Sequence, residues 1–115
     1  MLRKEIQVKS AERREIKPGV FRTCMYTDNL MTAVIDFTNG PWTEAEPPHS
    51  HPHEQVSFIA EGEVIFYCEG RPDRHLKPGD MFAVSSNLKH TIKVLTEKVR
   101  IIDSFTPIRE EFLDS

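Results

Sequence analysis

Short segments in which apolar and polar residues alternate make up most of the chain from residue 20 onward. β-branched and aromatic residues are concentrated in these segments, as is typical of β-strands. Turn sequences such as "TNGP", "EGRPD" and "KPGD" separate them. The pattern predicts strands at residues 20–26, 30–37, 54–61, 63–69, 80–85, 90–95 and 99–105.

The two ends of the chain carry less regular patterns. Residues 1–17 are dense in charge and are expected to form either an opening strand or an irregular arm. Residues 106–115 form a tail with room for one helical turn after Pro107. Because no linker interrupts residues 20–105, we expect all 115 residues to fold as one domain. Many short strands without a long helical period favour an all-β class, a sandwich or a barrel.

Composition narrows the range of partners. The chain has 15 basic and 18 acidic residues, a net charge of −3, and its basic residues form no cluster, so we expect no nucleic-acid partner. No apolar run approaches the roughly 20 residues that span a bilayer, and the charged N-terminus lacks the apolar middle of a secretory signal. We therefore expect a cytoplasmic protein without a membrane partner. In that compartment Cys24 and Cys68 are expected to be free, buried thiols.

The segment "PPHSHPHEQVSF", residues 47–58, holds three of the five histidines. In an extended strand, side chains two apart share a face, so His49, His51 and Gln55 are expected to point the same way. Two imidazoles and an amide oxygen make a start to a first-row transition-metal site. His90, which opens a predicted strand, is the expected fourth donor. His75 lies in a surface-like turn and is a poorer candidate.

Three prolines flank these histidines. Pro47, Pro48 and Pro52 restrict the backbone, which lowers the entropy lost when the segment binds an ion. The alternative to a metal site is that these histidines simply lie on the surface of a polar loop. His53 has the same parity as the ligands, but Pro52 interrupts the strand there, so we expect His53 to support a ligand or to face substrate.

The last predicted strand places an acid on an apolar face. Along "VRIIDSF", Asp103 shares its face with three large apolar residues and is expected inside the molecule or beside the cavity. An unpaired buried carboxylate is costly, so Asp103 either has structural hydrogen-bond partners or acts as a general acid/base. Arg109 follows in the tail. Its planar guanidinium suits a carboxylate ligand, and an exposed surface arginine is the alternative.

Two histidine-containing motifs resemble those of the cupin family. The first, H-x-H-x3-E-x6-G, corresponds to residues 49–62, and the second, G-x5-P-x-G-x2-H-x3-N, begins at Gly79 and reaches its histidine at His90. The resemblance implies a small antiparallel jelly-roll β-barrel, RmlC-like, with a metal in its mouth. Four positions depart from the motifs: Gln55 for glutamate, Ser85 for proline, Asn87 for glycine and Val94 for asparagine.

The glutamine has a chemical consequence. Three neutral imidazoles and a neutral amide leave a divalent ion with its full charge, whereas a glutamate would cancel part of it. Such a centre favours an anionic ligand and acts as a Lewis acid. Zinc, nickel, manganese and iron all accept these donors, so the sequence leaves the metal open.

Longer segments, "HSHPHEQVSFIAEGE", "IIDSFTPIREEFL" and "DNLM", resemble the KdgF-type cupins of pectin and alginate breakdown. The resemblance implies a metal-dependent enzyme that converts 4,5-unsaturated uronate monosaccharides, which are small anionic sugars, to linear 4-deoxy-5-keto uronates. It implies that Asp103 and Arg109 are catalytic or contact substrate, and that Phe105 lines the same pocket. The metal ligands it implies are His49, His51, Gln55 and His90.

Two other functions are compatible with the sequence. A non-catalytic cupin that binds a small sugar would need the same pocket, and an iron-dependent cupin dioxygenase would need a similar metal site. Gln55 weakens the case for oxygen chemistry without excluding it. The alternating strands, "GEVIFYCEG" among them, have edges that could pair between chains, and the family resemblance implies a homodimer.

Overall fold

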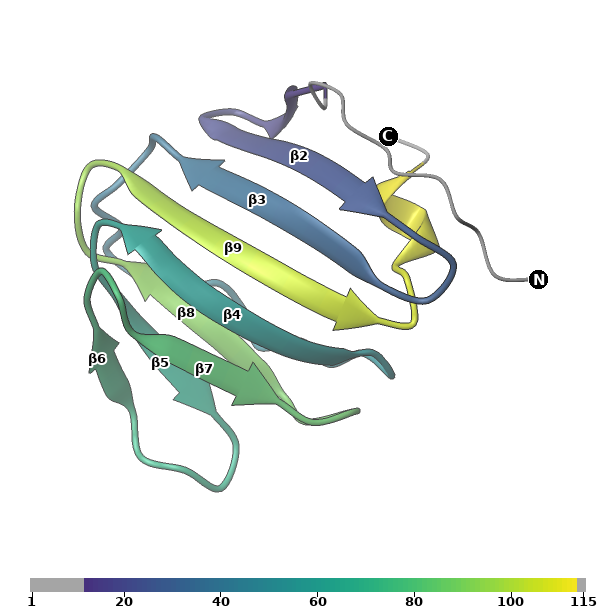
Figure 1. Ribbon diagram of the computed structural model, residues 1–115. Coiled ribbons are helices and arrows are strands. Elements are labelled where there is room, and N and C mark those ends of the chain that lie inside the picture. Colours follow the sequence, from purple (N-terminus) through teal and green to yellow (C-terminus); the bar gives the residue numbers. More distant parts are fainter. Residues whose placement is uncertain (1–11, 114–115) are drawn as a thin grey trace.

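Two antiparallel sheets face each other in the computed structural model, which describes residues 12–113 (Figure 1). One sheet has six strands and the other three, and every pairing between the strands is antiparallel. The six-stranded sheet has the order β1 (Arg14–Lys17), β2 (Val20–Tyr26), β3 (Met31–Phe37), β9 (Val99–Thr106), β4 (Glu54–Glu61) and β7 (Met81–Val84). The three-stranded sheet has the order β6 (Arg74–Leu76), β5 (Val64–Cys68) and β8 (His90–Val94).

These strands confirm the predicted all-β class. Strands were expected at 20–26 and 54–61, and β2 and β4 have those bounds. For residues 14–17 the structure selects the strand alternative, while residues 1–11 of the expected arm lie outside the described residues. The prediction missed β6, because its three residues are too few to show an alternating pattern. Pairing with β5 makes this segment a strand rather than the turn that its sequence suggested.

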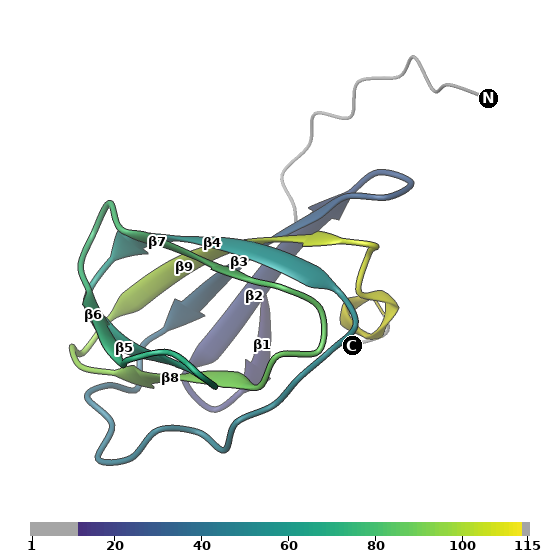
Figure 2. The ribbon, with the colours of Figure 1, turned by 90° about the horizontal axis from the view of Figure 1, so that it is seen from below.

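The hydrophobic core lies between the two sheets, which face each other in the view of Figure 2. Along β9, Val99, Ile101 and Phe105 are buried while Arg100 is exposed, which is the alternation expected of a strand with one face on the core. Burying a side chain of this size contributes roughly 1.5–3 kcal/mol to folding. The buried core is made up of Val20, Met31, Ala33, Ile35, Phe37, Ile59, Val64, Phe66, Leu76, Val84, Val94, Val99, Ile101 and Phe105.

Strand β9 lies in the middle of the large sheet, between β3 and β4. Its register with β4 sets Asp103 opposite Ser57 and Phe105 opposite Gln55. All four positions therefore lie along one pair of neighbouring strands, near the end where β4 begins.

Two irregular segments complete this end of the molecule. The long connection from β3 to β4 passes along β8 before it enters β4 (Figure 2). The tail after β9 forms the predicted short helical turn, η1 (Glu110–Phe112), beside the ends of β2 and β9 (Figure 1). No helix within residues 12–113 is long and apolar enough to cross a membrane.

Candidate metal centre

Three histidines converge where the β3–β4 connection meets β8. The possible ligand nitrogens of His49, His51 and His90 all lie within 4.8 Å of one another. Their ring centroids are separated by 4.5 Å for His49 and His90, 5.0 Å for His51 and His90, and 5.8 Å for His49 and His51. The structure thus brings together the three histidines that the sequence pattern selected.

The sequence pattern had predicted that a regular strand would bring these histidines together. The structure shows a different arrangement. Strand β4 begins only at Glu54, and His49 pairs with His90 in an isolated bridge with backbone hydrogen bonds of 3.0 and 2.9 Å. His51 is held by a further backbone bond, in which the Asn87 N–H donates to the His51 carbonyl at 2.8 Å. Prolines at 47, 48 and 52 supply no N–H donor, so they prevent a continuous ladder here.

Asn87 shows how one departure from the cupin motif is accommodated. Its backbone has φ of 66°, the left-handed region that glycine adopts without strain. Asparagine is one of the few other residues that visit this region readily. The turn before His90 therefore keeps its shape although the motif glycine is absent.

Hydrogen bonds assign the tautomers of two histidines. The Nδ1 of His51 lies 3.0 Å from the His53 carbonyl, and the Nδ1 of His90 lies 2.9 Å from the Leu88 carbonyl. A carbonyl can only accept, so both Nδ1 atoms carry the proton and donate it. In the neutral ring the Nε2 lone pair is then free, which is the state of a histidine prepared to ligate a metal.

Gln55 completes the donor set. Its Oε1 lies 3.1 Å from the His51 Nε2, and its amide nitrogen donates to Ser57 Oγ at 2.9 Å and to Asp103 Oδ1 at 3.4 Å. Because the His51 Nε2 carries no proton in this tautomer, it and the Gln55 oxygen are two acceptors that face each other. A cation between them would satisfy both.

The residues present therefore fit a divalent transition metal. Metal–nitrogen bonds of about 2.1 Å place the ligand atoms of a tetrahedral site about 3.4 Å apart, so side-chain movements of up to about 1 Å would close the cluster around an ion. Burial lowers the pKa of His51, and so to a lesser extent does the Arg109 charge. Burial and the neighbouring His90 and His51 lower the pKa of His49. Both shifts favour the neutral imidazole that binds metal.

Asp103 lies beside this centre. Its carboxyl accepts a hydrogen bond of 2.5 Å from Ser57 Oγ in addition to the bond from Gln55. Burial raises the pKa of Asp103 to about 6, against the opposing effects of Ser57, Arg109 and Gln55. A carboxyl with this pKa exchanges protons near neutral pH, which is the property required of a general acid/base.

The C-terminal tail brings Arg109 to the same cavity. Its guanidinium lies 5.2 Å from the Phe105 ring centroid and 4.4 Å from that of Phe112. The Nε and Nη2 of Arg109 donate to Glu111 at 3.0 and 2.8 Å, and the arginine side chain is only 17% exposed. Arg109 is therefore not the exposed surface arginine that the sequence left as an alternative.

The remaining two histidines lie outside the cluster. His53 donates from Nε2 to the Ile108 carbonyl at 3.2 Å, which links the β3–β4 connection to the tail. Whether His53 also faces substrate, as the sequence suggested, stays a prediction. His75 lies on β6, where its Nε2 is 2.7 Å from Glu63, and its side chain is half exposed.

A cavity of about 210 Å³ opens at the centre. Pockets for drug-sized ligands are typically 300–1,000 Å³, so this one suits a smaller molecule such as a monosaccharide. Its apolar wall comes mainly from side chains of the six-stranded sheet, with Ile92 from β8. Its polar wall includes His49, Gln55, His90, Asp103 and Arg109.

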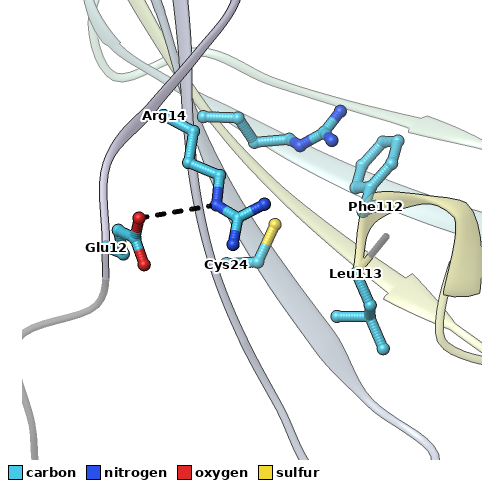
Figure 3. A pocket seen from close by; sticks show the side chains of 6 residues that line it. Glu12, Arg14, Cys24, Phe112 and Leu113 are labelled. Carbon is cyan, nitrogen blue, oxygen red and sulfur yellow. Dashed lines mark ion pairs between the residues drawn. The ribbon is translucent and has the colours of Figure 1, made fainter. Parts of the chain in front are cut away.

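A second hollow, of about 140 Å³, lies between β1, β2 and η1 (Figure 3). Arg22 and Phe112 border both hollows. The thiol of Cys24 lies here, but burial raises its pKa, which disfavours the reactive thiolate. We assign no chemistry to this hollow.

Sequence reasoning overlooked Ser57. This residue lies on the inward face of β4, two positions after Gln55, and it is 1% exposed. Its parity with Gln55 was visible in the sequence. Its contact with Asp103 was not, because that contact depends on the register between β4 and β9.

Comparison with known proteins agrees with this geometry. The sequence model of the cupin domain matches residues 38–105, which include all three clustered histidines. The chain is 33% identical over 101 residues to the pectin degradation protein KdgF of Dickeya dadantii, and the alignment covers 86% of this chain and 88% of that protein. The solved structure of KdgF from Halomonas sp. has a TM-score of 0.77 at 28% identity, covering 88% of this chain and 92% of that one.

A protein of a different functional class, a dioxygenase, is also similar in sequence to this chain. Acireductone dioxygenase of Bacillus cereus is 33% identical over 91 residues, or 76% of this chain, but the alignment covers 49% of that protein. The similarity to the KdgF proteins, in contrast, extends over most of both chains. The chain therefore belongs to the cupin family, with the jelly-roll fold that its motifs predicted and with KdgF, a pectin degradation protein, among its relatives.

Proposed function

We propose that the protein converts 4,5-unsaturated uronate monosaccharides to linear 4-deoxy-5-keto uronates during the breakdown of pectin or alginate. The observation that carries this proposal is the close association of an uncharged donor set with a carboxyl group that has a raised pKa. The ligands are His49, His51, Gln55 and His90, and the carboxyl belongs to Asp103. Similarity to KdgF supports the choice of substrate.

These four donors would hold zinc, nickel, manganese or iron. A divalent ion at this position would supply Lewis-acid stabilisation of the negative charge that develops on substrate oxygens. Since none of the four donors is charged, nothing in the ligand set reduces that effect.

The reaction needs one group that both accepts and donates a proton. In the cyclic substrate the C4–C5 double bond is part of an enol ether, and the ring oxygen also belongs to a hemiacetal at C1. When the anomeric hydroxyl loses its proton, C1 becomes a carbonyl and the bond from C1 to the ring oxygen breaks. The resulting C5 enolate takes a proton at C4 and becomes the 5-keto group. We assign both proton transfers to Asp103, whose pKa of about 6 suits them.

Arg109 and Phe105 have supporting roles in this proposal. The guanidinium of Arg109 would bind the substrate carboxylate or a hydroxyl group, because it borders the cavity and has N–H groups beyond the two that donate to Glu111. Phe105 would pack against the sugar, and His53 would approach the substrate from the β3–β4 connection. No hydride moves and no nucleotide is required.

Replacing Asp103 by asparagine tests the assignment. We expect Asp103→Asn to retain its metal content, because the asparagine oxygen can still accept from Ser57, and to lose at least about 100-fold in turnover. Turnover is followed as loss of the double-bond ultraviolet absorbance of freshly made unsaturated galacturonate, with and without chelator. A variant with near-normal rates would show that Asp103 is not the acid/base.

The same assay separates the proposal from its alternatives. Unsaturated uronate that binds tightly and is recovered unchanged would identify a non-catalytic sugar-binding protein. Turnover that strictly requires iron and consumes oxygen, with zinc and nickel inactive, would identify a dioxygenase. The cytoplasmic location and the homodimer are further parts of the proposal, and light scattering on the purified protein tests the dimer.

A further inference from the structure

We propose that Ser57 is a positioning residue that directs the amide oxygen of Gln55 toward the clustered histidines. The inference rests on the proposed metal site but is independent of the substrate assigned to it. It concerns a residue that neither the cupin motifs nor the sequence pattern selected.

Ser57 lies between two groups of the site. It is in β4, on the same face as Gln55, and the β4–β9 register sets it directly opposite Asp103. Its hydroxyl oxygen is 2.5 Å from Asp103 Oδ1 and 2.9 Å from the Gln55 amide nitrogen. With 1% of its surface exposed, Ser57 leaves little room for water to replace either bond.

The direction of each hydrogen bond follows from the chemistry of the partners. An ionised carboxylate can only accept, so the single proton of the Ser57 hydroxyl points to Asp103. The Ser57 oxygen is then left as an acceptor, and its neighbour in Gln55 must be the NH₂ group. Asp103 Oδ1 accepts from the same NH₂ group at 3.4 Å, which reinforces this orientation.

A fixed NH₂ group fixes the other end of the amide. The two ends of a glutamine amide have nearly the same shape, and only the oxygen can ligate a cation. With its nitrogen on Ser57 and Asp103, Gln55 presents Oε1 to the His51 Nε2, 3.1 Å away. If the amide turned over, its single oxygen would face two acceptors, Ser57 Oγ and Asp103 Oδ1, and an NH₂ group would face the metal site.

This requirement is peculiar to glutamine. The glutamate that the cupin motif carries at this position has two equivalent oxygens, and either can ligate a metal. Gln55 needs a partner that distinguishes its two ends, and the Ser57 hydroxyl makes that distinction. Partners of metal ligands commonly change metal affinity by 10- to 100-fold when they are removed.

Cobalt binding by the purified full-length protein tests the inference. Co²⁺ is titrated into metal-free wild type, Ser57→Ala and the control Ser104→Ala, and affinity and visible absorption are recorded. Ser104 lies in β9, and its hydroxyl is 3.2 Å from that of Thr32. We expect Ser57→Ala to bind Co²⁺ about 10- to 100-fold more weakly, with an altered visible spectrum because the amide oxygen is lost as a ligand. Ser104→Ala should match wild type.

A double variant separates positioning from a merely structural role. In the Gln55→Glu background, Ser57→Ala should lose much less affinity, because either carboxylate oxygen can bind the ion. An equal loss in both backgrounds would overturn the inference, as would wild-type affinity and spectrum in Ser57→Ala. If Ser57→Ala does not fold, Asp103→Ala removes the acceptor that directs the Ser57 proton and should produce the same spectral change. Failure of wild type to bind Co²⁺ would instead refute the proposed metal site itself.

Discussion

The role proposed for Asp103 depends on its position on one strand. Alternation along β9 places its carboxyl on the inward face, and pairing with β4 surrounds it with Ser57 and Gln55. The sequence predicted the inward direction, because three large apolar neighbours share that face. It could not decide between a structural and a chemical role, since the decision depends on partners from β4. The raised pKa and the cavity position favour the chemical role.

The same burial has a consequence for stability. The pKa of Asp103 is about 6 in the folded protein and 3.8 in the absence of its surroundings. Above about pH 6 the carboxylate is charged in both states, so the folded protein bears the full cost of burying it. As pH falls toward 4, the folded state takes up the proton first and that cost is relieved. Metal-free Asp103→Asn should therefore be more stable than wild type at pH 7, by roughly 1–3 kcal/mol.

Urea unfolding of the chelator-treated protein at several pH values measures this difference. The advantage of Asp103→Asn should shrink as the pH falls from 7 toward 4. Asp28→Asn, in the exposed turn between β2 and β3, is the matched control and should stay within about 0.5 kcal/mol of wild type throughout. An advantage that is the same at every pH would mean that burial of the charge is not its cause.

At the scale of elements, sequence predictions succeeded where the alternating pattern was long. The seven- and eight-residue strands β2 and β4 were predicted with their bounds, but three-residue β6 was taken for a turn. The histidine segment before β4 was expected to follow the spacing of an extended strand, but the structure gives it an isolated bridge instead. Its residue types correctly predicted that His49, His51 and His90 would cluster. The path of the segment depends on backbone bonds to the β8 region that the sequence alone does not reveal.

The tail illustrates an element held by contacts distant in sequence. The Phe112 ring contacts two guanidinium groups: its centroid is 3.9 Å from the guanidinium of Arg22 and 4.4 Å from that of Arg109. The turn η1 is too short to be stable alone, so these contacts, together with the His53 bond to Ile108, keep Arg109 at the cavity.

Removing the Phe112 ring should therefore weaken substrate binding. Cation–π contacts contribute about 0.5–2 kcal/mol, so Phe112→Ala is expected to raise KM for unsaturated galacturonate by about 2- to 30-fold. The value of kcat should change less, because Asp103 and the metal ligands are untouched. Steady-state ultraviolet assays give both constants. The control is Leu113→Ala, which removes an apolar side chain packed against the core from the same tail. Equal effects of the two variants would argue against a specific role for the ring.

At the scale of the molecule, the proposed metal site joins the two sheets. Gln55 belongs to β4 of the six-stranded sheet, and His90 belongs to β8 of the three-stranded sheet. His49 and His51 come from the connection that passes between them. An ion bound to all four donors would link elements that otherwise hold together mainly through the core, so metal binding and folding should be coupled.

Metal removal should accordingly lower the melting temperature. An ion present at 100 times its Kd stabilises the folded state by about 2.7 kcal/mol, if it does not bind the unfolded chain. For a chain of this size that corresponds to a shift of roughly 10 °C, measurable by calorimetry with and without chelator. His90→Ala should abolish the metal-dependent part of the shift, whatever its effect on the metal-free protein. His75→Ala is the matched control, because His75 lies on β6 outside the cluster, and it should retain the full shift. A wild-type protein whose melting temperature ignored both metal and chelator would contradict a site that ties the sheets together.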